Sequence, residues 1–143
     1  MFEIRCYDDL GELRRIIRVA IAGQPVTPDL VSRYEAAQLG LRQSGRAAAF
    51  RRILEDVTYP TELPVYDRIV GTATGDLWVG AYQPFGDGRG LWWCLDDEGR
   101  LVGWVEFPER FTPFMFEGDI VRGVWRDDLD VEHIHTYRIE WPS

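Results

Sequence analysis

A segment of this chain is repeated after 43 residues, and this repeat constrains the fold more than any single motif does. Gly75–Tyr82 (GDLWVGAY) recurs as Gly118–Trp125 (GDIVRGVW). A second echo links Cys6–Leu13 to Cys94–Leu101, 88 residues later. Internal repeats of about 40–45 residues, each holding several short strands, are typical of architectures that repeat one small β-sheet. The sequence therefore predicts repeated antiparallel sheets within a single domain spanning residues 1–143.

Strand and turn signals divide the chain into three β units. Residues 1–20 form two strand-like arms around the turn Asp8–Gly11, which predicts a hairpin because glycine accepts a positive φ. Residues 64–107 predict a meander of four strands, and residues 111–141 predict three more. By the second echo, the hairpin matches strands three and four of the complete unit. The predicted strand count is therefore two, then four, then three.

Residues 25–57 interrupt this pattern and predict a helical hairpin. Thr27 can cap the first helix, and Pro28 suits its first position. Apolar residues then recur at helical spacing on one face of each helix: Leu30, Tyr34, Ala37 and Leu41 in the first, and Phe50, Ile53, Leu54 and Val57 in the second. The segment is therefore predicted to be an insertion between the first strand pair and the complete sheet.

The repeat length and the strand count together define the predicted fold class. It is mainly β, with about two antiparallel four-stranded meander blades of β-propeller type and an inserted helical hairpin. A closed propeller needs at least about four blades, which is more than 143 residues supply. The unit at 111–141 would also leave an unpaired strand edge, and such edges favour pairing with another chain. We therefore expect self-association, or association with another propeller segment.

The charge and hydropathy of the chain exclude some partners. The formal net charge is −8 and the pI is near 4.7. An acidic surface repels phosphate backbones, so no nucleic-acid partner is expected. No apolar run approaches the roughly 18 residues of a membrane-spanning helix, so no membrane partner is expected either. The first residues alternate and carry charge, unlike a signal peptide, which by default favours a cytoplasmic location.

Four segments carry a resemblance to a known family: Tyr7–Leu13, Gly75–Val79, Leu95–Leu101 and Gly123–Leu129. Through them the chain resembles the C-terminal portion, about two blades, of bacterial six-bladed β-propeller proteins of the NHL-repeat type. The resemblance covers residues 1–20 and about 59–141. It implies a scaffold whose loops bind ligands, proteins or sugars. Proteins that share such a fold seldom share one activity.

The candidate ligand-binding residues lie in two predicted loops. The first loop, residues 84–90, is rich in glycine and joins two strands, and the second follows the repeat Gly118–Trp125. Loops at strand ends carry the binding residues of many scaffolds. The glycine-rich loop precedes a strand and not a helix, so it is not predicted to cradle a phosphate. The candidates are Phe85, Asp87, Arg89, Arg126, Asp127 and Asp128.

Residues with metal-binding or catalytic potential also have a structural explanation. His133 and His135 alternate along a predicted strand and share a face, which makes them candidate metal ligands. No third ligand has a suitable spacing, so neither a metal nor another cofactor is expected. The acidic clusters Asp96–Glu98 and Asp127–Asp130 lie in predicted turns, where aspartate bonds its own backbone. They could otherwise supply paired acids for hydrolysis.

Three hypotheses for the function remain open. The favoured one is a non-enzymatic binding or interaction module, which self-associates through unpaired blade edges and binds a small molecule or a protein. The second is a hydrolase or lyase on a propeller scaffold, using loop carboxylates or the pair His133 and His135. The third is a truncated propeller fragment with no independent function. No nucleophile has a recognisable catalytic setting, so no catalytic residue is assigned.

Overall fold

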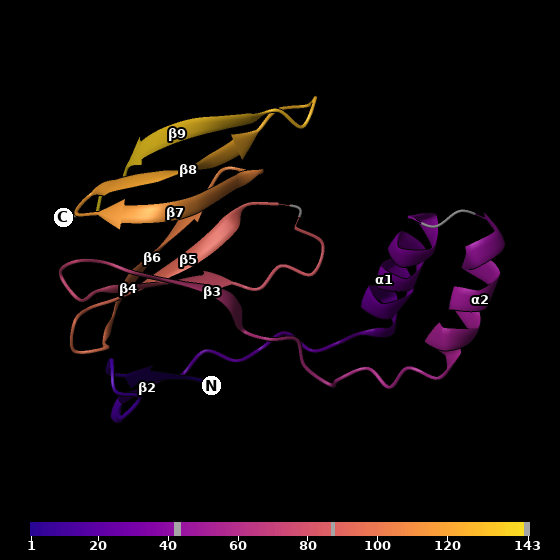
Figure 1. Ribbon diagram of the computed structural model, residues 1–143, viewed down its shortest axis with the longest axis horizontal. Helices are drawn as coiled ribbons and strands as arrows, with labels where there is room; N and C mark the ends of the chain where they lie inside the picture. The colour runs from indigo at the N-terminus through magenta and orange to yellow at the C-terminus, as the bar shows by residue number, and fades with distance from the viewer. Residues whose placement is uncertain (42–43, 87, 142–143) are drawn as a thin grey trace. The chain divides into compact units, whose positions relative to one another are not determined.

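The computed structural model describes residues 1–41, 44–86 and 88–141, and only the backbone of Ser44. This part of the chain divides into two compact units (Figure 1). The first joins Met1–Ala22 with Val65–Ser143 and contains the described strands, and the second, Gly23–Pro64, contains the described helices. The prediction of a mainly β chain with antiparallel sheets and a helical insertion is confirmed.

The described strands form three antiparallel sheets in which each strand pairs only with its neighbours in sequence. The sheet orders are β1-β2, β3-β4-β5-β6 and β7-β8-β9. The strands are β1 (Phe2–Tyr7), β2 (Leu13–Val19), β3 (Tyr66–Gly71), β4 (Leu77–Ala81), β5 (Gly90–Leu95), β6 (Leu101–Phe107), β7 (Phe111–Glu117), β8 (Ile120–Arg126) and β9 (Glu132–Arg138). Within the described residues, the predicted counts of two, four and three strands are confirmed.

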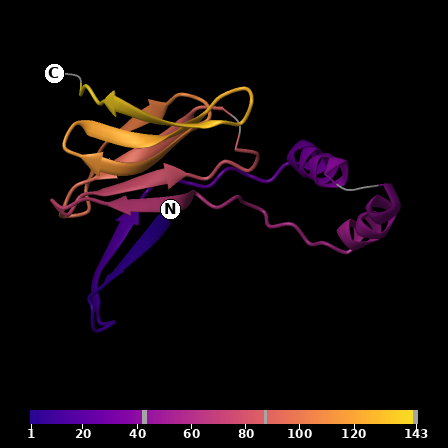
Figure 2. The ribbon, with the colours of Figure 1, turned by 45° about the horizontal axis from the view of Figure 1, so that its top comes forward.

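The sheets lie as layers, with the four-stranded sheet between the other two (Figures 1 and 2). Both faces of this middle sheet are apolar, because successive side chains of a strand point to opposite faces and β4 and β5 are apolar throughout. The buried residues are Val79, Trp93 and Leu95 on the face toward β1-β2, and Trp78, Trp92 and Cys94 on the face toward β7-β8-β9. The middle sheet therefore contributes to two separate cores.

The first core joins the β1-β2 hairpin to the middle sheet. The ring of Phe2 lies 5.0 Å from that of Tyr66 and 5.9 Å from that of Trp93, measured between centroids. Ile17 and Val19 of β2 are buried against the same face. The hydroxyl of Tyr66 donates to the carbonyl oxygen of Glu3 at 3.2 Å. Aromatic packing thus fixes the hairpin on β3 and β5.

The second core joins the middle sheet to β7-β8-β9 and is also rich in aromatic rings. Trp78 and Phe116 stack with their centroids 4.3 Å apart and their planes 7° from parallel. The rings of Phe107 and Phe111, on either side of the β6–β7 turn, lie 5.3 Å apart. Val121 is completely buried between the layers. Buried aromatic contacts of this kind supply most of the packing energy available to a small sheet stack.

The second unit consists of α1 (Pro28–Gly40) and α2 (Ser44–Glu55). The predicted cap is confirmed, because Oγ1 of Thr27 accepts a hydrogen bond from the amide of Leu30 at 3.2 Å. The predicted apolar stripes are less buried than expected: Leu54 is 7% exposed, whereas Ile53 is 59% exposed. Two short helices offer each other little surface to cover. None of the described helices has both the length and the apolar composition needed to cross a membrane.

The chain enters and leaves this helical unit through two segments that lie side by side. Pro25 and Glu62 form an antiparallel bridge. On either side of it, the amide of Val26 donates to the carbonyl of Thr61 at 2.9 Å, and that of Leu63 donates to the carbonyl of Gln24 at 2.8 Å. We call these paired segments, residues 24–26 and 61–63, the neck.

Candidate functional site

Three of the strand connections are built on the same aspartate-centred turn. In each, one carboxylate oxygen accepts the backbone N–H groups of the residues two and four positions later, at 2.8–3.0 Å. The aspartates are Asp8 between β1 and β2, Asp96 between β5 and β6, and Asp127 between β8 and β9. This geometry confirms that the acidic clusters have a turn-forming role.

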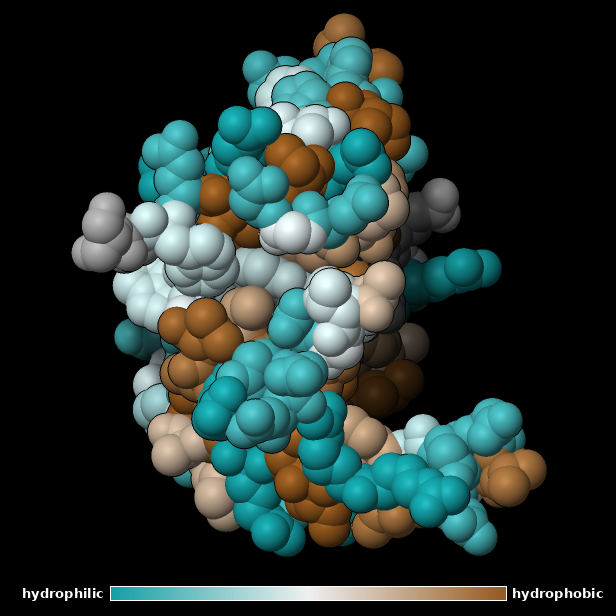
Figure 3. Space-filling view, turned by 90° about the vertical axis from the view of Figure 1, so that its left-hand side faces the viewer, coloured by the Kyte–Doolittle hydropathy of each residue, from teal (hydrophilic) through white to brown (hydrophobic). Residues whose placement is uncertain are grey.

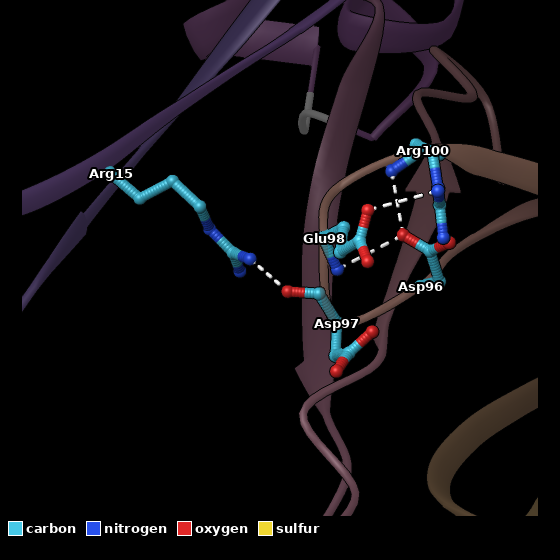
Figure 4. Close-up of polar contacts among 5 residues, drawn as sticks. All are labelled: Arg15, Asp96, Asp97, Glu98 and Arg100. Carbon is cyan, nitrogen blue, oxygen red and sulfur yellow. Dashed lines mark hydrogen bonds and ion pairs between the residues drawn. The ribbon is translucent and has the colours of Figure 1, made fainter.

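The turn at Asp96 shows how fully these acids are occupied (Figure 4). Nε of Arg100 lies 2.8 Å from Oδ2 of Asp96, and Nη1 of Arg100 lies 2.9 Å from Glu98. From the neighbouring layer, Nη1 of Arg15 on β2 donates to the backbone carbonyl of Asp97. The turn therefore connects the hairpin to the middle sheet, and the carboxylates of Asp96 and Glu98 are engaged in structural contacts.

These contacts stabilise the ionised carboxylates. Hydrogen bonds from backbone amides lower the pKa of all three aspartates, the main donors being the amide of Glu12 for Asp8, that of Arg100 for Asp96 and that of Val131 for Asp127. The Arg14 and Arg100 side chains lower it further for Asp8 and Asp96, as His133 does for Asp127. Acids held in the ionised form by their own turns are poor proton donors near neutral pH.

We predict that stability falls in acid because of these three turns. Unfolded aspartate titrates near pH 4, and the folded pKa values lie lower, so the unfolded state binds protons first as the pH falls. The stabilisation is therefore complete above about pH 5 and is lost progressively below about pH 4. Urea unfolding between pH 2 and pH 7 measures it. The variant with Asp8, Asp96 and Asp127 all replaced by Asn keeps an acceptor oxygen and should show a flatter curve; an unchanged curve would contradict the assignment.

The third turn differs from the other two in the residue that closes it. That position has a left-handed backbone in each turn: Gly11 at φ 79°, Gly99 at φ 83° and Asp130 at φ 60°. Glycine adopts this conformation without steric cost, whereas aspartate does so with some strain. Arg110, in the turn between β6 and β7, also has a positive φ of 63°. The two strained residues of the described chain both border the surface hollows described next.

A small hollow opens where the middle sheet meets β7-β8-β9, and its volume is about 190 Å³. The start of β3, the end of β4, the loop before β5 and the start of β7 surround it. Trp92 lines it, although this side chain is only 4% exposed. The lining residues are Asp67, Arg68, Gly80, Ala81, Gln83, Gly86, Gly88, Gly90, Trp92, Arg110, Phe111, Thr112 and Pro113.

A wider and more open hollow of about 630 Å³ continues from the small one. The two share Arg68, Gly86, Arg110 and Thr112 in their walls. The wider hollow adds Val124, Arg126, Asp127, Asp128, Asp130 and Glu132, from the end of β8, the following turn and the start of β9. We call the two hollows together the groove.

Arginine side chains dominate the polar contacts in the groove. Nη1 of Arg110 lies 2.7 Å from Asp128, and Nη2 of Arg126 lies 2.6 Å from Glu132. Arg68 is exposed and forms no ion pair with any residue that the structure describes. The exposed ion pairs of Arg110 and Arg126 contribute little to stability, because water and salt screen them. The guanidinium groups therefore remain available to a ligand.

The structure brings together only part of the predicted ligand-binding set. Arg126, Asp127 and Asp128 all line the wider hollow. Phe85 is half-buried in its loop and Arg89 is exposed, and neither is among the described residues that line the groove. The prediction for Asp87 falls outside the described residues.

Sequence reasoning missed Arg68, Arg110 and Trp92, which the fold brings together from three different strands and turns. A partial signal for Arg110 was its place in Pro108–Phe111, a short turn between two predicted units. Nothing local in the sequence distinguishes Arg68 or Trp92 from other strand residues.

The two predicted metal-ligand candidates have aromatic and turn contacts instead of a third ligand. The ring of His135 stacks on Trp125 at 5.1 Å, with the planes 12° apart. Nε2 of His133 lies 3.1 Å from Oδ2 of Asp127, at the third aspartate-centred turn. Among the described residues, no three His, Cys, Asp or Glu side chains are grouped closely enough to hold a metal ion.

Comparisons with models of protein families, with curated proteins and with solved structures found no match to this chain. The groove, and not a relative, is therefore the starting point for its function.

Proposed function

We propose that this protein is a non-catalytic binding module whose ligand occupies the groove, and whose layered sheets are propeller-type blades. The observation that carries the proposal is that four segments, far apart in the sequence, together form the walls of the groove. The start of β3, the loop after β4, the β6–β7 turn and the β8–β9 turn all contribute to the walls. Concave sites with a few convergent polar groups are the usual form of small-molecule sites.

The state of the reactive groups favours binding over catalysis. Asp127 is held ionised by backbone amides, and His133 is hydrogen-bonded to it. Burial raises the pKa of the Cys94 thiol to about 11, so this cysteine is a thiol and not a reactive thiolate near neutral pH. A base within reach of an accessible nucleophile, the basis of covalent catalysis, is not found among the groove residues described above.

A ligand screen with a blocking variant tests the groove. Small acids, amino acids, sugars and nucleosides are added while the amide resonances of Arg68, Arg110 and Thr112 are followed by NMR. Thr112→Trp places an indole in the wall shared by both hollows, and Thr136→Trp places the same group on exposed β9 outside them. At least one compound should shift the amide resonances of Arg68 and Arg110 in the wild type and in Thr136→Trp, but not in Thr112→Trp. Equal shifts in both variants would refute the site.

Self-association is a second function that a separate observation favours. β9 is an edge strand of its sheet, and its Ile134 is 66% exposed, while Phe114 of β7 is 49% exposed. On the face shown in Figure 3, apolar residues reach the surface at several places between polar ones. Unpaired edge strands with exposed apolar side chains favour pairing with a strand of another chain.

Light scattering on a sizing column measures this association. The wild type should elute as a discrete oligomer, and Ile134→Lys should shift it toward the monomer because an edge charge blocks strand pairing. Leu129→Lys is the matched control, since Leu129 is 84% exposed and lies in a turn. A monomeric wild type would refute self-association and leave the groove unaffected.

A further inference from the structure

The two parts of the groove differ in their balance of charge. The wider hollow has three arginines against four carboxylates, those of Asp127, Asp128, Asp130 and Glu132. Among its described lining residues, the small hollow has two arginines, Arg68 and Arg110, and one carboxylate, that of Asp67. In a chain with a net charge of −8, the described lining of the small hollow therefore holds more cationic than anionic side chains.

We propose that the small hollow binds the anionic group, a carboxylate or a phosphate, of a small ligand, with Arg68 and Arg110 as its two cationic contacts. This inference rests on the proposed binding function and names the ligand class. Planar guanidinium groups bind carboxylate and phosphate through paired, charge-assisted hydrogen bonds. A volume of about 190 Å³ suits a small ligand, because sites for drug-sized molecules span roughly 300–1,000 Å³.

Arg110 is held in place by its backbone while its side chain stays exchangeable. Its carbonyl accepts the amide of Arg126 at 3.1 Å, and the amide of Phe111 donates to the carbonyl of Pro108 at 3.3 Å. Its ion-pair partner, Asp128, has a side chain that is 97% exposed, so an incoming anion competes with a well-solvated carboxylate. The left-handed backbone of Arg110 is a strained conformation of the kind that concentrates at ligand sites.

Arg68 is the more available of the two cations. It lies on β3, where its backbone pairs with Gly80 of β4, which also lines the hollow. No described residue forms an ion pair with it, so binding an anion does not require an internal contact to break. Asp67 lines the same hollow from the adjacent position and is the one carboxylate among the described lining residues that opposes an anion.

Neutral donors complete the site. The indole nitrogen of Trp92 has no hydrogen-bond acceptor in the described part of the chain. In that part, every completely buried side-chain nitrogen or oxygen has a hydrogen-bond partner. The indole nitrogen is therefore not completely buried, and Trp92 lines the hollow. The hydroxyl of exposed Thr112 lies in the same wall. Phe111 and Pro113 supply apolar walls against which the uncharged part of a ligand can pack.

Titration with two simple anions tests the inference. Sodium phosphate and sodium acetate are each added at constant ionic strength, and the amide resonances of Arg68, Arg110 and Thr112 are followed by NMR. Arg68→Gln and Arg110→Gln each remove one cation. Arg122→Gln removes a cation of β8 that lies outside the groove lining and is only 3.7 Å from Glu117. Losing one charge-assisted contact should weaken binding by about tenfold or more.

The inference is supported if phosphate, acetate or both shift these resonances, with Kd raised by about tenfold or more in Arg68→Gln and Arg110→Gln and unchanged in Arg122→Gln. The anion that binds more tightly shows whether the anionic group of the ligand is a phosphate or a carboxylate. Unchanged affinity in Arg68→Gln and Arg110→Gln overturns the inference. If neither anion binds but an uncharged compound shifts the same resonances, the anion inference fails and the binding function stands. If nothing binds in the groove, both fail.

Discussion

Replacing Trp78 with alanine should lower the free energy of unfolding of the β unit by about 3–5 kcal/mol. Trp78 is 3% exposed and stacks on Phe116, so its ring connects the middle sheet to β7-β8-β9. Its removal deletes one of the two tryptophan side chains buried in the second core and leaves a cavity that the flat neighbouring ring of Phe116 cannot fill. Urea unfolding followed by near-UV circular dichroism measures the loss.

Trp104→Ala is the matched control for this prediction. Trp104 lies on β6 of the same sheet, opposite Trp93, but is 60% exposed. Its removal costs only a cross-strand contact, about 1 kcal/mol or less. If the two variants lose the same stability, the stack between Trp78 and Phe116 does not hold the layers together.

Gly123→Val should destabilise the same unit by about 3 kcal/mol or more, through overpacking and not through a cavity. A Cβ atom at Gly123 would lie 2.5 Å from the backbone carbonyl oxygen of Thr112 and still nearer to the ring of Phe111. Neither can move freely, because Thr112 belongs to a paired strand and Phe111 is buried against Phe107. Thermal unfolding should show a large fall in Tm.

Gly71→Val makes the same change in a strand where there is room. At Gly71, which ends β3, the nearest atom to an added Cβ is a side-chain carbon of Leu77 at 3.8 Å. Stability should change by about 1 kcal/mol or less, since valine suits an exposed strand position. An equal fall in Tm for both variants would show that the close approach at Gly123 is not the cause.

The fold was predictable because its determinants are local. The aspartate turns, with a left-handed residue three positions later, mark the ends of β1, β5 and β8, and the apolar runs of β4 and β5 mark a sheet buried on both faces. Each sheet is a meander, so pairing follows sequence order. The burial of the helical faces was not predictable. Periodicity shows which residues share one face of a helix, but it does not show whether another element covers that face. Leu41 fits the pattern and is 80% exposed.

The groove was only half predictable for the opposite reason. Arg126, Asp127 and Asp128 belong to one turn, whose place at a strand end can be read from the sequence. Arg68 and Arg110 lie near this turn only because two sheets pack against each other. Their positions in the sequence do not indicate that packing. The glycine-rich loop was predicted as a site for Phe85 and Arg89, but the described groove uses its glycines Gly86, Gly88 and Gly90.

The neck affects the entropy cost of folding the β unit. Docking the hairpin on the middle sheet closes a loop that contains the whole of Gly23–Pro64, and such closures slow folding and cost entropy. Once the segments around Pro25 and Glu62 pair, the effective loop shrinks to a few residues on either side of that bridge. The helical unit can then lengthen, shorten or fluctuate without changing the entropy of assembling the sheets.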